Sequence, residues 1–394
     1  VGEITEHVGA REAQSKDRPS IAVLPFANLS GDAAQDYFAD GMVAEIITGL
    51  SRIKWLLVIS RSSTLAYRGG PVDAKAVGAD LGVRYVLEGS VRREGDHVRV
   101  MGQLIETENA THVWADRYEG TLGSIFELQD AMTMSVIGAV EPTLRRAEIE
   151  RARRKRPDSL DAYDLFLRAL PFVGTAMPDD ADRALPLLEA AIRLEPDYAA
   201  AHGCIAWCHE QRYLRGGLYA ETREAARRHA HAAIEFGGDD ALALAMGGFV
   251  VGVIERDYRT ALDALDRSLL LSASSAFAFG CSSIIRAWMG DTETAIAHAN
   301  IGLRLGPHDP LIFMPCVGLA YAYFFAGRFS EAADAAGRAA AANPRFSVPR
   351  YLHAAALTRL GRKDEASEAA RVLLALQPGF TVSSLVSGNI TTPE

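Results

Sequence analysis

The chain has 394 residues and a net charge of −9, with 49% hydrophobic and 23% charged residues. This length exceeds one ordinary core, so at least two domains are expected, and the composition excludes a globally disordered chain. The negative charge disfavours nucleic-acid binding by the whole chain. Four cysteines are too few for a disulfide framework, and the polar N-terminus lacks the pattern of a secretion signal. A cytoplasmic location is therefore predicted.

Residues 20–122 alternate between strand and helix patterns, after a polar linker at 1–19. The predicted elements are a strand at 21–26, a helix at 39–53, a strand at 56–60, a helix at 72–82, and strands at 85–92, 97–105 and 111–118. In the strand at 97–105, the apolar residues Val98, Val100 and Leu104 alternate with polar ones. The order β-α-β-α-β-β-β predicts an α/β domain with an antiparallel meander at one edge.

One loop of this domain, residues 27–32, follows a strand and precedes a helix, where α/β folds often bind ligands. Arg61, Ser62 and Ser63 follow the second strand and could hold an anion. The favoured interpretation is a loop fixed by its own hydroxyl groups. The sequence contains no glycine-rich phosphate loop and no metal-ligand spacing, so neither a cofactor nor a metal site is predicted.

Four motifs in this half carry a family resemblance. They are IAVLPFANLSGD at 21–32, YFADG at 37–41, YVLEGSV at 85–91 and HVWADR at 112–117. They resemble the TolB-amino-terminal-like domain, which is related to a domain of flagellar outer-membrane protein O. The most similar version follows class III adenylate/guanylate cyclase domains or winged-helix DNA-binding domains in proteobacteria, and tetratricopeptide repeats follow it.

The resemblance covers about residues 19 to 378 and implies a module without catalytic residues of its own. The paired metal-binding aspartates and the purine-reading residues of the cyclases have no counterpart in this sequence. The chain is therefore predicted not to be an enzyme, although the parent protein of such a module can be a cyclase.

A connecting helix is predicted at 123–157. Its apolar stripe contains Leu128, Met132, Val136, Val140 and Leu144. Pro142 is expected to kink this helix or to split it in two. Between residues 143 and 156 there are seven basic and two acidic side chains, for which a solvated helix face is favoured over a nucleic-acid or lipid contact.

Residues 158–378 repeat with a period of about 34 residues, followed by a tail at 379–394. Small residues recur in the second helix of each repeat: Ala184, Ala226, Ala261, Ala295, Ala332 and Ala366. Prolines at 307, 344 and 378 end the last three repeats, and Gly290, Gly327 and Gly361 begin the turns between paired helices. This pattern predicts six tetratricopeptide (TPR) repeats in an all-α superhelical solenoid, with longer loops in the first two. Three uncharged runs at 241–254, 268–285 and 310–327 keep this period, so no membrane span is predicted.

In solenoids of this family, the first helix of each repeat lines the concave surface. Aromatic residues occupy the positions that would face this groove: Trp207, Phe249, Trp288, Tyr321, Phe325 and Tyr351. They predict binding of an apolar or amphipathic peptide segment, although the same side chains could instead belong to the core. The lysine and asparagine pattern that clamps the carboxylate of chaperone tails is missing.

Cys204, Cys208, His202 and His209 lie within one predicted helix. A metal site there is disfavoured, because zinc requires a closed set of ligands and free cysteine often acts as a small core residue. The favoured function is a non-catalytic regulatory and protein-interaction module. The alternatives are the C-terminal part of an adenylate/guanylate cyclase and the regulatory part of a DNA-binding transcriptional regulator. The sequence also leaves undecided whether the chain forms a homodimer.

Overall fold

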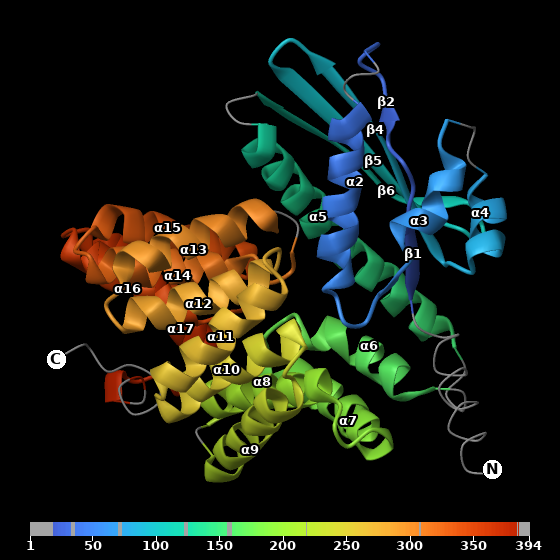
Figure 1. Ribbon diagram of the computed structural model, residues 1–394. Helices are drawn as coiled ribbons and strands as arrows, with labels where there is room; N and C mark the ends of the chain where they lie inside the picture. Colours follow the sequence, from blue (N-terminus) through green and yellow to red (C-terminus); the bar gives the residue numbers. More distant parts are fainter. Residues whose placement is uncertain are drawn as a thin grey trace. The chain divides into compact units, whose positions relative to one another are not determined.

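The structure is a computed structural model that describes residues 19–32, 36–69, 73–121, 125–155, 160–217, 219–306, 309–383 and 385. The chain divides into two compact units, Val1–Glu148 and Ile149–Glu394 (Figure 1). We call them the α/β unit and the repeat unit. The predicted fold class, an α/β domain followed by an all-α TPR solenoid, is confirmed.

The α/β unit is built on one mixed sheet. Its described strands are β1 (Ser20–Val23), β2 (Ala27–Asn28), β3 (Leu57–Val58), β4 (Tyr85–Glu94), β5 (His97–Glu106) and β6 (Thr111–Thr121). The strand order is β3-β1-β4-β5-β6, with β2 beside β4. β1 runs parallel to β3 and β4, whereas β4, β5 and β6 form the predicted antiparallel meander. The strand predicted at 21–26 ends already at Val23 in β1, before Pro25, which has no N–H group for a sheet ladder; β2 begins beyond the predicted bounds, at Ala27.

Helices cover both faces of this sheet. They are α2 (Asp36–Ser51), α3 (Arg61–Thr64), the 3₁₀ turn η2 (Leu65–Tyr67), α4 (Ala74–Leu81) and α5 (Ile125–Arg154). On one face, Met42 of α2 and Val140 of α5 share a core with Leu87 of β4. On the other face, Val77 of α4 packs with Val86. Gly82 ends α4 in the left-handed region, with a φ of 64°.

Helix α5 continues through Pro142 as one helix, so of the two predicted effects of this proline the division into two helices is wrong. Val136, Val140 and Leu144 of its apolar stripe are buried, whereas the side chains of Leu128 and Met132 lie outside the described residues.

The C-terminal part of α5 also contains a buried carboxylate. Glu148 is fully buried and accepts hydrogen bonds from Arg84 Nη1 at 2.7 and 2.8 Å and from the Tyr85 hydroxyl at 2.8 Å. Basic side chains nearby also have acidic partners: Arg145 pairs with Glu141 at 3.1 Å. The predicted solvated helix face is observed at Arg146, Arg153 and Arg154, which are exposed, but not at the buried Glu148.

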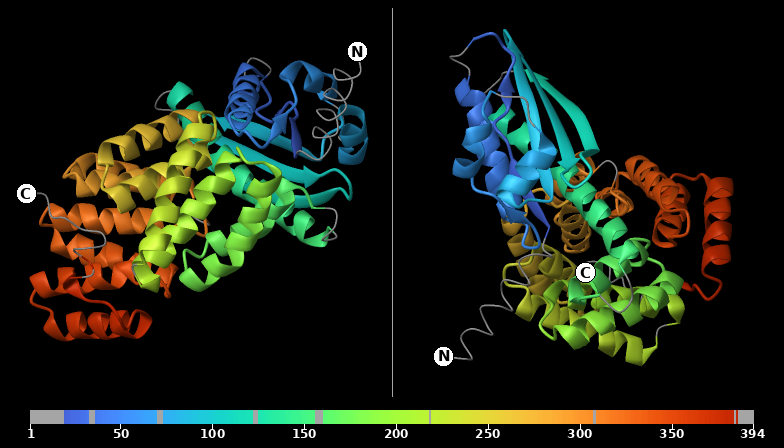
Figure 2. Two further views of the ribbon diagram at one scale, coloured as in Figure 1. Left: turned by 90° about the horizontal axis from the view of Figure 1, so that it is seen from below. Right: turned by 90° about the vertical axis from the view of Figure 1, so that its right-hand side faces the viewer.

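In the described part of the repeat unit, helices follow one another in six antiparallel pairs. The pairs are α6 (Ala162–Val173) with α7 (Pro178–Leu194), α8 (Ala199–Gly216) with α9 (Ala220–Phe236), α10 (Ala241–Glu255) with α11 (Tyr258–Leu271), α12 (Ala276–Trp288) with α13 (Thr292–Leu305), α14 (Phe313–Phe325) with α15 (Phe329–Ala342), and α16 (Val348–Arg359) with α17 (Lys363–Leu376). Figure 2 shows these pairs stacked along the unit. We call the first helix of each pair the A helix and the second the B helix.

Small residues lie where the paired helices meet. Ala184, Ala226, Ala261 and Ala295 have no exposed surface, as the repeat pattern predicts. Gly290, Gly327 and Gly361 adopt φ values of 84°, 74° and 75° in the turns between helices. Pro307 lies outside the described residues.

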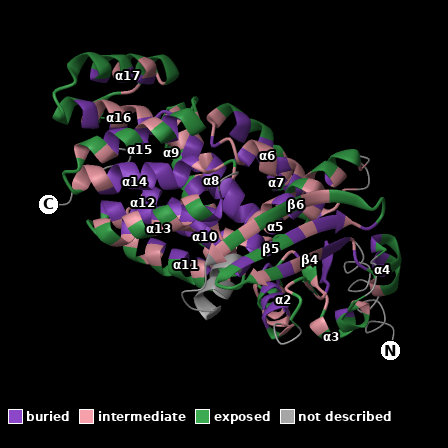
Figure 3. Cartoon of the chain, turned by 90° about the horizontal axis from the view of Figure 1, so that it is seen from above, coloured by how far each residue is buried: buried purple, intermediate pink, exposed green. Residues whose placement is uncertain are grey.

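The predicted longer loop is present in the first repeat, where residues 174–177 connect α6 and α7, but not in the second. Most of the additional residues lengthen the helices, since α7 and α9 have 17 residues and α8 has 18, whereas α13, α15 and α17 each have 14. Buried residues follow the A helices α8, α10, α12 and α14, and α17 is largely exposed (Figure 3). No helix among the described residues is long and apolar enough to cross a membrane.

Candidate functional site

The aromatic residues that the sequence assigns to the groove form two local clusters in the repeat unit. The ring centroids of Trp207 and Phe249 are 5.6 Å apart, on the neighbouring A helices α8 and α10. Farther along, the ring of Tyr321 lies 5.5 Å from Trp288 and 6.1 Å from Phe325, and its hydroxyl is hydrogen-bonded to the Tyr351 hydroxyl. The period thus places the predicted residues on successive A helices.

Most of these aromatics are not accessible. Trp207, Phe249, Trp288 and Tyr321 have exposed fractions of only 1%, 5%, 6% and 2%. The prediction that they line an open groove is therefore wrong for these four in this structure. The physical reason is that each ring is inserted between neighbouring A helices; the Trp207 indole also donates to the carbonyl oxygen of Val173 at 3.3 Å. Phe325 and Tyr351 are half-buried and remain the accessible members of the set.

A polar cluster that the sequence analysis missed lies near Tyr351. Glu210 and Gln211 of α8 have exposed fractions of 3% and 2%, and the Gln211 amide donates to the Glu210 carboxylate. Arg215, one turn farther on, is half-buried. The available signal was the run of polar and charged residues that continues α8 beyond the length of the other A helices.

Burial dominates the protonation chemistry of this cluster. Burial raises the pKa of Glu210 to about 7, although Arg215 and the Gln211 amide both oppose the shift. Burial also lowers the pKa of Arg215 to about 10, against the attraction of Glu210. The Tyr351 hydroxyl pKa is raised by burial as well, so this phenol is neutral at physiological pH. The cluster can therefore exchange a proton near neutral pH.

The cysteine and histidine residues near α8 form a packed layer. Cys204 and Cys208 are buried free thiols. His202 joins α8 to α9 through a 2.8 Å contact between its Nδ1 and that of His229, and its Nε2 lies 2.9 Å from the Pro196 carbonyl oxygen. Burial lowers the pKa of His209 and of His229 to about 4, which keeps both rings neutral. Within the described ranges, no group of three His, Cys, Asp or Glu side chains could hold a metal ion.

The α/β unit contains a crevice of about 1060 Å³ beyond the carboxyl end of β1. Polar groups from several elements line it: Asn28, Asp36, Tyr67, Arg68, Glu88 and Gln103. These groups bind one another or their neighbours: Asn28 donates to Asp36 at 2.7 Å, Gln103 donates to Glu88, Arg68 pairs with Asp40 and Tyr67 donates to Asp80. These paired groups therefore do not indicate a class of ligand for the crevice.

The segment after β3, predicted as a loop, forms the short helix α3, and its hydroxyl groups contact one another as the favoured interpretation expects. The Ser60 hydroxyl lies 3.0 Å from that of Ser62 and 3.1 Å from that of Ser63. Arg61 is half-buried and pairs with Asp40 at 3.4 Å.

Comparison with known proteins gives two sequence matches. Residues 16–134 match the family described as "HilA/YgeH-like transcriptional regulator, second domain". A Rhizobium meliloti (strain 1021) protein named "Putative adenylate cyclase 3" is 41% identical over 189 residues, which are 48% of this chain and 32% of that protein. The chain thus spans about a third of the length of this relative.

Solved structures show partial likenesses. TolB from Acinetobacter baumannii is 20% identical with a TM-score of 0.24, over 32% of this chain and 28% of that chain. The type IV pilus biogenesis factor PilW is 17% identical with a TM-score of 0.40, over 57% of this chain and 97% of that chain. The Cut9-Hcn1 hetero-tetramer of the APC/C is 14% identical with a TM-score of 0.46, over 66% of this chain and 54% of that chain.

The resemblance stated from the sequence agrees with these matches. One sequence match has the name of an adenylate cyclase, and the other is a domain of transcriptional regulators. Together with the observed elements, they agree with the predicted order of an α/β domain followed by repeated helix pairs.

Proposed function

We propose that this chain is a non-catalytic regulatory module that recognises a protein or peptide and serves a signalling output domain in the cytoplasm. The observation that carries the proposal is the solenoid of helix pairs that follows the α/β unit. TPR solenoids present extended surfaces built from successive repeats, and such surfaces bind proteins. The 41% identity to a protein named as an adenylate cyclase supports a cyclase domain as the output.

Binding is proposed at the accessible part of the inner surface. Phe325 and Tyr351 are half-buried and contact the buried Tyr321, so they combine partial exposure with a fixed position. Rigid aromatic side chains of this kind frequently dominate binding energy. Trp288, in contrast, is only 6% exposed, so its replacement should act mainly through stability.

The experiment on the output uses the cyclase-named relative from Rhizobium meliloti. Cyclic AMP formation by the full-length relative should change when its segment similar to this chain is deleted, because a regulatory module alters the rate of its output domain. The rate should return when the corresponding segment of this chain is inserted. The isolated chain, assayed with ATP or GTP and a divalent metal, should form no cyclic nucleotide. An unchanged rate after deletion, or turnover by the isolated chain that survives repurification, would contradict the proposal.

The family match at residues 16–134 favours a second candidate, in which the output domain binds DNA. The basic side chains near the end of α5 would then give only a supporting contact, since Arg145 and Arg153 are already paired with Glu141 and Glu150. DNA binding by this chain that weakens steeply with salt would favour this candidate over the cyclase one. Sedimentation of the same samples measures whether two copies associate.

A further inference from the structure

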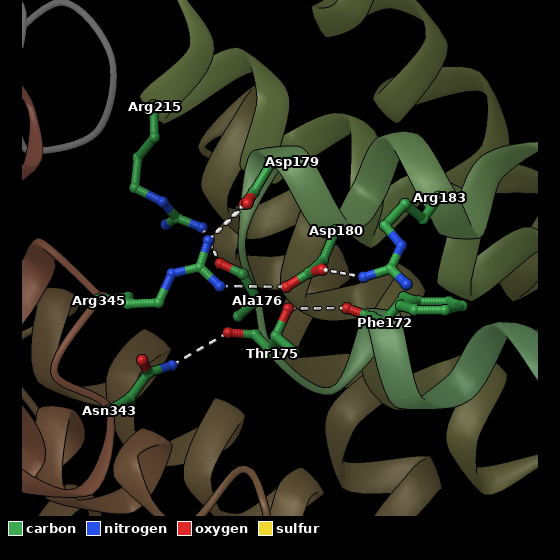
Figure 4. Close-up of polar contacts among 9 residues, drawn as sticks. All are labelled: Phe172, Thr175, Ala176, Asp179, Asp180, Arg183, Arg215, Asn343 and Arg345. Carbon is green, nitrogen blue, oxygen red and sulfur yellow. Dashed lines mark hydrogen bonds and ion pairs between the residues drawn. The ribbon is translucent and has the colours of Figure 1, made fainter.

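The repeat unit contains contacts between repeats that are far apart in sequence. In an ordinary solenoid each repeat touches only its neighbours. Here the beginning of α7 meets the segment between α15 and α16. Arg345 Nη2 donates to the two carboxylate oxygens of Asp179 at 2.7 and 2.6 Å, and its Nη1 lies 3.4 Å from Asp180 Oδ2 (Figure 4). Asn343 Nδ2, 168 residues from Thr175, donates to the Thr175 carbonyl oxygen at 3.0 Å.

A second set of contacts joins the second repeat to the same region. Arg215, at the end of α8, donates to the Ala176 carbonyl oxygen, and its guanidinium lies 4.5 Å from the centre of the Phe346 ring. Gln377, after α17, donates to the Leu214 carbonyl oxygen at 3.3 Å. We call this set the clasp; its side chains are Asp179, Asp180, Arg215, Asn343, Arg345 and Gln377.

We propose that the clasp is a releasable lock that holds the first two and the last two repeats together and limits access to the inner surface of the solenoid. Release would separate Arg215 from the buried ring of Phe346 and expose the surface around Tyr351 to a protein partner. That a protein partner binds the exposed surface rests on the proposed function, whereas the existence of the lock does not.

The chemistry of the clasp favours two states of similar free energy. Its main ion pair is solvent-exposed, with 52% of the Arg345 side chain and 66% of the Asp179 side chain accessible, and exposed ion pairs stabilise only weakly. The closed state also has a cost, because Gln211 Oε1 and Arg215 Nε are buried and have no hydrogen-bond partner among the described residues. Opening would hydrate these atoms and offset the lost contacts. A small difference between two states is what a switch requires.

The experiment compares hydrogen exchange and small-angle scattering of the full chain with those of Arg345→Asp, which places like charges against Asp179 and Asp180. Exchange in α16, α17 and the turn at residues 174–177 should become about ten-fold faster or more, the change that about 1.4 kcal/mol produces. The radius of gyration should increase. Adding Asp179→Arg to this variant should restore much of both values, because the ion pair is reformed with reversed charges.

The matched control is Arg371→Asp, which makes the same charge change at an exposed pair with Glu368 inside α17. Asn343→Ala provides a milder test, since it removes one hydrogen bond of the clasp and should give a smaller change in the same segments. The clasp is not a lock if the hydrogen-exchange rates and the radius of gyration of Arg345→Asp match those of the control. The same conclusion follows if hydrogen exchange becomes faster evenly over all helices. These measurements need no partner, so this outcome would leave the proposed function untouched.

Discussion

Gly327 ends α14 in the left-handed region, with a φ of 74°. Its N–H donates to the Phe324 carbonyl oxygen, and the following Arg328 N–H donates to that of Tyr323, which is a Schellman motif. No atom lies within 4 Å of a Cβ added at Gly327, so only the backbone opposes alanine there. Gly327→Ala should lower the free energy of unfolding by roughly 1–2 kcal/mol, measured by chemical denaturation.

Gly337 provides the control, because the same substitution there should change the free energy of unfolding in the opposite direction. It lies inside α15, and an added Cβ also meets no atom within 4 Å. Gly337→Ala should therefore stabilise by about 0.5–1 kcal/mol, because alanine has the higher helix propensity. Equal effects of the two substitutions would show that the φ value does not determine the cost at Gly327.

At the scale of single residues, the sequence predicts which helix each aromatic residue lies on, but not whether its ring is exposed to solvent. The 34-residue period correctly places Trp207, Trp288 and Tyr321 on the A helices. Whether a ring at such a position faces solvent depends on the side chains of the next A helix and on contacts between distant repeats. The burial of Trp207 beside Phe249, for example, cannot be read from the spacing of the repeats.

At the scale of elements, Ala299 tests the packing of α12 against α13. It has no exposed surface and belongs to the main core of the repeat unit. Ala299→Leu should destabilise the unit by roughly 1–3 kcal/mol or more, because the larger side chain overpacks a close helix contact. Thermal unfolding followed by circular dichroism measures the change.

Ala297 is the matched control, since it lies exposed on the same helix. Ala297→Leu should change stability by no more than about 0.5 kcal/mol. A melting temperature that Ala299→Leu leaves at its original value would mean that the assignment of small residues to the helix contact is wrong.

Most elements could be predicted because each depends on local periodicity. The alternation of Val98 and Val100 determines the inward face of β5, and Gly82 predicts the end of α4. The division into β1 and β2 and the unbroken course of α5 depend on tertiary context. A helix tolerates Pro142 when its apolar stripe is held in a core, as Val140 and Leu144 show.

At the scale of the whole molecule, contacts between distant repeats could not be predicted. Arg345 and Asp179 are 166 residues apart and belong to no repeated motif. The same holds for the surroundings of Glu210, a polar residue at the interior of the repeat unit whose electrostatic neighbours include Arg215 on its own helix, Cys281 on α12 and Tyr351 on α16.

Glu210 predicts a dependence of stability on pH for the repeat unit. Burial raises its pKa from 4.5 to about 7, so the folded state keeps a proton that the unfolded state has released. The contribution of Glu210 to the free energy of unfolding therefore falls as pH rises from about 4.5 to about 7. Glu210→Gln, which resembles the protonated form, should be more stable than the original chain at pH 8 by on the order of 1–3 kcal/mol. At pH 4.5 the two should differ little.

The test is the difference in free energy of unfolding between the original chain and Glu210→Gln, because other groups oppose this trend in either chain alone. His209 and His229 have pKa values lowered from 6.5 to about 4, so their contribution to stability rises over that interval. Both histidines are present in the original chain and in the variant, and their effect cancels in the difference. Glu189→Gln, at an exposed position on α7, is the control and should change stability by no more than about 0.5 kcal/mol. A constant difference for Glu210→Gln at every pH would show that the buried carboxyl group titrates alike in the folded and unfolded states.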